Sequence, residues 1–115
     1  METSITSRNF ELDGSLKEYI HSRLDKLGRV YSRIYRFEVI LEEEKIRKNV
    51  EIIVHLKRNR IIAKESSQET YSSVDSALES IKKQLRRLND RVRSKRRRTM
   101  MKRFINPMTM FRGRR

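Results

Sequence analysis

The chain of 115 residues contains no cysteine and no tryptophan, and it has only one proline and three glycines. Without cysteine it has neither disulfide bonds nor thiolate metal sites, which suits a reducing compartment. The glycines do not form a phosphate-binding loop, and no arrangement of serine, histidine and acid indicates a nucleophile. We therefore expect no enzyme, no cofactor and no small-molecule substrate.

Long hydrophobic runs are also missing. No stretch approaches the roughly 18 apolar residues of a membrane span, and the N-terminus does not resemble a signal peptide. The sequence therefore predicts a cytosolic protein. His21 and His55 lie far apart and lack a ligand spacing, so we expect ordinary surface or edge histidines and no metal. The run Glu42-Glu43-Glu44 is interpreted as a solvated hairpin end rather than a cation site.

Positive charge is abundant and unevenly distributed. The formal net charge is +14; residues 1–94 hold 20 Lys/Arg against 15 Asp/Glu, while residues 95–115 hold nine Lys/Arg and no acid. We expect a folded domain over residues 1–94 and a basic tail over residues 95–115. Such a balance favours phosphate-rich partners, although anionic membranes and acidic proteins also attract basic proteins.

The period of the apolar residues predicts six elements. A short strand over residues 4–12 precedes a helix near residues 14–31 that begins at Asp13-Gly14-Ser15. Alternation from Tyr35 to Leu41, from Val50 to Leu56 and over residues 61–65 indicates three further strands. A long helix follows near residues 70–94. Its apolar stripe consists of Val74, Ala77, Leu78, Ile81, Leu85, Leu88 and Val92.

This order predicts an α+β fold, β-α-β-β-β-α, with both helices packed on one face of a four-stranded sheet. The first strand is expected to run parallel to its neighbour and the last three to form an antiparallel meander. Six side chains are expected to be buried: Leu24, Leu27, Val39, Val54, Ile81 and Leu85. Ile40 and Ile53 are expected on the open sheet face.

The face of the long helix opposite its apolar stripe carries Lys83, Arg86, Arg87 and Arg93, with Lys82 at its margin. Cations spaced by helical turns repel one another, and a polyanionic partner would offset that repulsion. The alternative is a solvated face, because lysine and arginine are good helix formers. The helix alone leaves both interpretations open.

The segments ITSRNFEL, LKEYIHSRLDKL, FEVILEEEK, VEIIVHL and ETYSSVDSALESIKKQLRR follow one another in this order. Together they resemble the ribosome hibernation promoting factor family, also described as ribosome-associated inhibitors, over roughly residues 1–93. The most informative pieces are Arg8-Asn9, Lys26-Leu27 and Tyr71-x-x-x-Asp75. No single piece is a strong signature; their order and spacing carry the resemblance.

The resemblance implies a domain similar to double-stranded RNA-binding domains that lies on the small ribosomal subunit. There it would occupy the path of messenger RNA and transfer RNA and silence translation in starved or slow-growing cells. The implied partners are small-subunit ribosomal RNA and neighbouring ribosomal proteins, with no membrane and a free monomer. Long family members carry a second, dimerising domain for which this sequence has no room, so it resembles a short form.

Recognition of ribosomal RNA through its backbone and shape requires cations and no catalytic group. The first candidates are Lys82, Lys83, Arg86 and Arg87. The second group comprises Arg8, Lys26, Arg29, Arg91 and Arg93, continued in the tail by Lys95, Arg96, Arg97 and Arg98. Tyr71 is interpreted either as a stacking residue or as a packing staple, and Asp75 as a first-turn residue that complements the helix dipole.

The tail has too little aliphatic content for a core, and Pro107 and Gly113 argue against a continuous helix beyond Arg93. We interpret it as a disordered arm that orders on RNA, with Phe104 or Phe111 available to stack. A solubilising extension and a membrane-surface segment are its alternatives. For the whole chain, two further functions remain open: a general RNA- or DNA-binding module, and a protein-interaction module that modulates transcription.

Overall fold

The computed structural model describes the backbone of residues 2–112 and the side chains of residues 2–91. The elements follow one another as β1 (Glu2–Arg8), α1 (Gly14–Val30), β2 (Ile34–Glu44), β3 (Arg47–Leu56), β4 (Arg60–Ser67) and α2 (Thr70–Arg112). The order β-α-β-β-β-α predicted from the sequence is confirmed. Contacts divide the chain into two compact units, residues 1–85 and residues 86–115.

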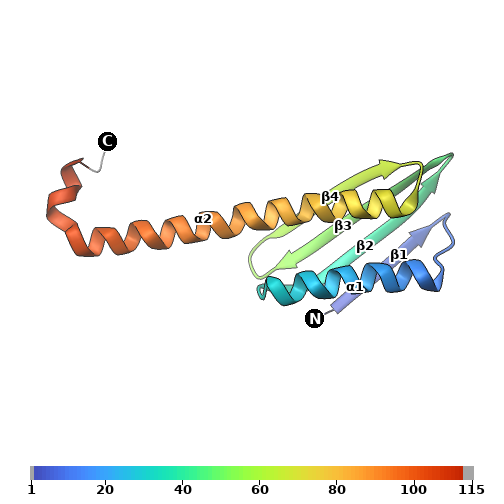
Figure 1. The fold of residues 1–115 in the computed structure, drawn as a ribbon, viewed down its shortest axis with the longest axis horizontal. Helices are drawn as coiled ribbons and strands as arrows, with labels where there is room; N and C mark the ends of the chain where they lie inside the picture. Colours follow the sequence, from blue (N-terminus) through green and yellow to red (C-terminus); the bar gives the residue numbers. More distant parts are fainter. Residues whose placement is uncertain (1, 113–115) are drawn as a thin grey trace. The chain divides into compact units, whose positions relative to one another are not determined.

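The four strands form one sheet in the order β1-β2-β3-β4. β1 pairs with β2 in parallel, and β2, β3 and β4 form the expected antiparallel meander. Figure 1 shows α1 and the part of α2 up to Leu85 on the same face of this sheet, running in the same direction. Within residues 2–85 neither helix covers the opposite face, which we call the open face.

The core lies between the sheet and the two helices. Leu24, Val54 and Ile81 are 0% exposed, and the other three side chains of the predicted set are buried as well. The inner strands of the sheet contribute Phe37, Val39 and Ile52, which are at most 1% exposed. Burial of this apolar set is the main stabilising contribution to the domain.

Local signals set the ends of α1. Asp13 is its N-cap, and its Oδ1 accepts a hydrogen bond from the backbone amide of Leu16 at 2.8 Å. At the other end the amide of Tyr31 donates to the carbonyl of Leu27 at 3.0 Å. Tyr31 therefore lies just past the helix and is half-buried, whereas the apolar residues within the helix are buried: Leu16, Ile20, Leu24 and Leu27.

Two strand predictions need correction. β1 ends at Arg8 rather than Leu12, because Asn9 adopts a left-handed backbone with φ of 51°, which interrupts an extended strand. In β2 the register shifts between Ile34 and Arg36. As a result Ile34 is buried and Tyr35 is 57% exposed, so Tyr35 does not share the core face of Phe37.

α2 is fixed to the sheet by polar as well as apolar contacts. The buried Ser73 donates through Oγ to the carbonyl of Lys48 in β3 at 2.8 Å. The side-chain amide of Gln84 donates to the carbonyl of Ile62 in β4 at 3.2 Å. Glu69 caps the helix start, where its carboxylate accepts from the amide of Ser72 at 3.3 Å.

The expected end of the second helix near residue 94 was wrong, since α2 extends to Arg112. Between Ser94 and Asn106 the sequence contains no glycine or proline, and lysine, arginine and methionine favour the helix. Pro107 removes one backbone donor without ending the element. The interpretation of residues 95–112 as an irregular arm is therefore corrected to a helix. In the part of the chain that the structure describes, no helix is long and apolar enough to cross a membrane.

Candidate nucleic-acid interface

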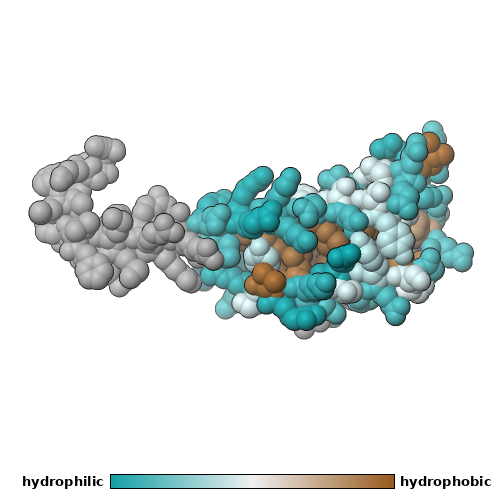
Figure 2. Space-filling model, in the orientation of Figure 1, coloured by the Kyte–Doolittle hydropathy of each residue, from teal (hydrophilic) through white to brown (hydrophobic). Residues whose placement is uncertain are grey.

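Lys82 and Lys83 of α2 lie on the side of the helix that faces away from the sheet. Ile81 and Leu85 are buried against the core, whereas Lys82 and Lys83 between them are exposed. Figure 2 shows hydrophilic surface over the helical face of the domain, with apolar surface between the two helices. Lys82 approaches Glu79 at 3.8 Å, and among residues 2–91 Lys83 has no ion-pair partner.

Arg86, Arg87 and Arg91 belong to the second compact unit, which begins at Arg86. All three side chains are exposed. Within the described side chains none of them forms an ion pair, which leaves their guanidinium groups available for phosphate. Arg93, Lys95, Arg96, Arg97 and Arg98 lie outside the described side chains, so their roles stay predictions.

The two helices are joined by a polar and aromatic contact near their first turns. The hydroxyl of Tyr19 in α1 donates to Asp75 in α2 at 2.5 Å, which raises the pKa of Tyr19. The rings of Tyr19 and Tyr71 meet edge to face with centroids 4.9 Å apart, and the guanidinium of Arg23 lies 4.6 Å from the Tyr19 centroid. Tyr71 is thus a packing residue. Asp75 lies beyond the first turn of α2, which contains no acid, so the helix-dipole interpretation was wrong.

This contact also places the cations of α1. The helices run in the same direction, and Tyr19 of α1 contacts Asp75 of α2. Lys26 and Lys82 each lie seven residues further along their helices, so they lie at the same level. Lys26 and Arg29 are exposed in the last turns of α1. The structure therefore brings these two second-group candidates to the same end of the domain as Lys82 and Lys83.

Arg8 does not join them. It is exposed at the last position of β1, where it pairs in register with Glu42 of β2. Glu42 is eight residues from the start of β2, roughly 26 Å along the strand. Arg8 therefore lies at the opposite end of the sheet from Lys26 and Arg29, next to the acidic hairpin, where Glu43 pairs with Lys48 at 2.8 Å.

Four cations that the sequence analysis did not select lie at the same end as Lys26. They flank the end of α1 and the β3–β4 turn: Arg33, Lys57, Arg58 and Arg60. With Arg29 they form a group that we call the loop-end cations; all five side chains are exposed. The run Lys57-Arg58-Asn59-Arg60 was a visible signal, but it was interpreted only as a turn.

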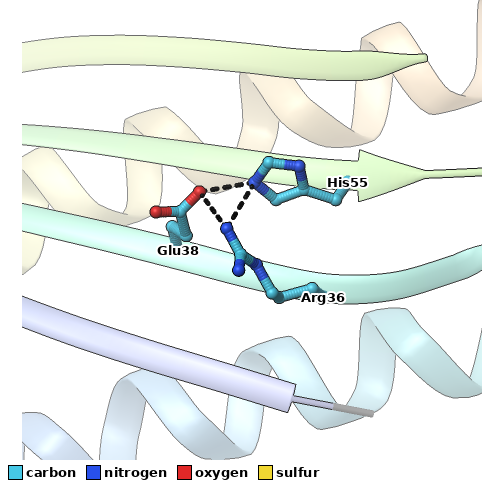
Figure 3. Close-up of polar contacts among 3 residues, drawn as sticks. All are labelled: Arg36, Glu38 and His55. Carbon is cyan, nitrogen blue, oxygen red and sulfur yellow. Dashed lines mark hydrogen bonds and ion pairs between the residues drawn. The ribbon is translucent and has the colours of Figure 1, made fainter.

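A polar cluster on the open face of the sheet joins β2 to β3 (Figure 3). Glu38 Oε2 lies 2.9 Å from Arg36 Nη2, which donates to it, and 2.5 Å from His55 Nε2. Hydrogen bonds from His55 and then from Arg36 lower the pKa of Glu38 below its ordinary value of 4.5. His55 is a half-buried partner of this carboxylate rather than an ordinary surface histidine. Among the described residues no His, Cys, Asp or Glu group is suited to a metal ion.

We expect Glu38→Gln to destabilise the domain at about pH 7 and to have little effect in acid. A carboxyl with a lowered folded pKa contributes stability that is complete above its unfolded pKa and is lost as the pH falls through the folded pKa. The measurement is urea unfolding of both proteins from about pH 7 down to about pH 3. Glu51→Gln, on the same face and without an ion pair among the described residues, is the control. A difference that stays constant with pH would contradict the role of Glu38.

The sequence of this chain is similar to the sequences of known proteins. Residues 3–93 match the family described as sigma 54 modulation protein / S30EA ribosomal protein. The ribosome hibernation promoting factor of Escherichia coli K12 is 26% identical over 93 residues, covering 81% of this chain and 98% of that protein. The protein of the same name from Pseudomonas putida is 20% identical over 94 residues, covering 82% and 92%.

Two solved structures have a similar fold. A ribosomal subunit interface protein from Coxiella burnetii superposes with a TM-score of 0.74 at 22% identity, covering 78% of this chain and 99% of that one. The N-terminal domain of Thermus thermophilus Protein Y gives a TM-score of 0.67 at 22% identity, covering 74% and 94%. The family match ends at residue 93, so the whole tail lies outside it.

Proposed function

Since the chain belongs to the sigma 54 modulation protein / S30EA ribosomal protein family, we propose that it is a ribosome hibernation factor. It binds the small ribosomal subunit in the path of messenger RNA and transfer RNA and inhibits translation in resting or stressed cells. It acts in the cytoplasm on the ribosome and is a monomer when free. The names of its relatives, ribosome hibernation promoting factor and ribosomal subunit interface protein, support this proposal.

The observation that carries the proposal is the row of exposed cations on α2. Lys83, Arg86 and Arg87 have no ion-pair partner among the described residues, although 15 acids are present in the chain. Unpaired cations on a rigid helix suit the phosphates of structured RNA, where binding releases counterions. Of the second group, Lys26 and Arg29 continue the surface of Lys82 and Lys83 to the end of α1.

The mechanism is occupancy and requires no bond to be made or broken. A helix held by a buried stripe positions the cations without a large entropic cost, because their backbone is already ordered before binding. A protein bound in the messenger path excludes messenger and transfer RNA sterically. Inhibition is therefore expected to be relieved by high salt or by excess messenger RNA.

Cosedimentation with intact ribosomes in the presence of excess bulk duplex RNA and DNA tests this function. We expect the protein to remain with the ribosomes. Equal partition between ribosomes and bulk nucleic acid would support a general nucleic-acid-binding module instead. A salt-insensitive complex with a protein and no ribosome association would support the transcription module.

We retain the division into a ribosome-binding domain over residues 1–94 and a basic tail over residues 95–115 as part of the proposal. The tail carries nine Lys/Arg and no acid, and it extends the cationic surface along RNA beside the messenger path. Lys95, Arg96, Arg97 and Arg98 are its first phosphate contacts. Solubilising and membrane-surface roles are its alternatives.

Removal of residues 96–115 is expected to leave a folded domain that binds ribosomes but dissociates faster, with a difference that shrinks as salt rises. The gain from the tail is expected to be moderate, because salt screens contacts between exposed cations and phosphates. Dissociation rates of both proteins from surface-immobilised small subunits, measured across a salt series, test this expectation. Equal rates at every salt concentration would show that the tail does not contribute, and selective loss of binding to anionic vesicles would indicate a membrane role.

A further inference from the structure

The loop-end cations come from two segments that the sheet holds side by side. Ile34, which follows Arg33, pairs in register with Leu56, which precedes Lys57. The β3–β4 turn is closed by the amide of Leu56, which donates to the carbonyl of Asn59 at 2.8 Å. Residues 28–33 and 57–60 contain no acid, so both segments carry only positive charge.

A large aromatic side chain lies on the open face beside these cations. The register shift in β2 turns Tyr35 out of the core, leaving it 57% exposed with its ring centroid 6.1 Å from that of His55. His55 pairs in register with Arg60, one of the loop-end cations, and with Arg36. Bulges of this kind commonly re-aim a side chain at a functional position.

The acid of the β2–β3 cluster does not neutralise the group. Glu38 is engaged by Arg36 and His55, which fixes its carboxylate within the β2–β3 cluster shown in Figure 3. Among the described residues Arg60 forms no ion pair, and the same holds for Arg33 and Arg58. An exposed tyrosine next to free arginines provides the two components of single-strand recognition, a stacking surface and phosphate contacts.

Resting on the proposed function, we infer that Tyr35 and the loop-end cations form a second RNA site, which binds unpaired nucleotides. A base stacks on Tyr35 while Arg33, Arg58 and Arg60 contact the flanking phosphates. Duplex RNA does not fit this site, because its bases are stacked within the helix and expose no free ring face. The proposed site lies on the open face of the sheet and at the end of the sheet where β2 begins. Lys82 and Lys83 lie on the helical side of the domain. The domain thus holds a paired segment on its helices and an unpaired one at this end.

Fluorescence anisotropy of the full chain with a short labelled oligouridine, in excess unlabelled duplex RNA, tests this site. Tyr35→Ala is expected to weaken binding roughly tenfold, since one stacked base is lost. Tyr35→Phe retains the ring and is expected to bind nearly as well as the unmodified chain. Arg33→Gln with Arg58→Gln should weaken binding, whereas the matched control Lys17→Gln with Lys45→Gln, which removes equal charge at the opposite end of the domain, should not.

Binding to vacant small subunits, which contain no messenger RNA, separates the sources of the nucleotide. A weaker complex with Tyr35→Ala there identifies an unpaired ribosomal nucleotide, and an effect on oligouridine alone identifies a messenger-like strand; both support the site. If the unmodified chain binds subunits, and Tyr35→Ala changes neither the affinity for subunits nor the affinity for oligouridine, the second site is overturned and the proposed function stands. If the unmodified chain does not bind subunits, the proposed function fails, whatever the oligouridine shows.

Discussion

Replacing Lys82, Lys83, Arg86 and Arg87 by glutamate is expected to weaken binding to the small subunit at least about a hundredfold near physiological salt. Each true phosphate contact that is removed makes the logarithmic dependence of affinity on salt shallower by roughly 0.7–0.9, and reversal adds repulsion. The thermal midpoint should change little, because all four side chains are exposed. Filter binding across a salt series and a thermal melt measure the two quantities.

A smaller matched pair controls for net charge. Lys83→Glu with Arg87→Glu reverses two cations one turn apart on α2, and Lys17→Glu with Lys64→Glu makes the same change in charge elsewhere. The pair on α2 should account for a large part of the loss of affinity for the small subunit, and the control pair for little of it. Similar losses from both pairs would mean that overall charge, not the α2 face, determines binding. Normal binding by the quadruple variant would exclude this face.

Phe37→Ala is expected to lower the free energy of unfolding by about 3–5 kcal/mol, a large part of the stability of a small domain. Phe37 is 0% exposed on the inner strand β2, so truncation leaves a cavity in the core. Urea unfolding gives the value, and Phe37→Leu serves as a milder variant should the alanine protein fail to fold.

Tyr35→Ala is the natural comparison, because the simple alternation of the sequence would have placed both rings in the core. With Tyr35 57% exposed, we expect its truncation to cost less than about 1 kcal/mol. Comparable losses from both substitutions would contradict the register shift between Ile34 and Arg36.

Much of the fold could be predicted because its apolar residues keep a regular period. The alternation from Phe37 onward correctly predicted the strand and its core face. The spacing of three and four residues from Val74 to Leu85 did the same for the long helix. The family resemblance, carried by the same segments, agrees with the match over residues 3–93. The register shift before Phe37 and the left-handed backbone of Asn9 were missed, because the spacing of apolar residues does not reveal local irregularities of the backbone.

The candidate site was predictable only in part. Exposed cations opposite the buried stripe of α2 follow from helical spacing, whereas the separation of Arg8 from Lys26 depends on the direction of β1. The cluster of Arg36, Glu38 and His55 joins residues 17 and 19 positions apart, so it required the register of β2 against β3. The length of α2 was underestimated because Pro107 was given more weight than the helix-forming residues before it.

The absence of cysteine makes one measurement especially direct, since a single cysteine can carry a probe without background labelling. An iron chelate tethered to a Lys83→Cys variant bound to small subunits should cleave ribosomal RNA that lines the messenger and transfer RNA path. Excess messenger and transfer RNA should suppress that cleavage. A Glu44→Cys variant, exposed at the β2–β3 hairpin, serves as the control and should give a different pattern. Cleavage from Lys83→Cys that falls outside the path, or that matches the Glu44→Cys pattern, would contradict the account.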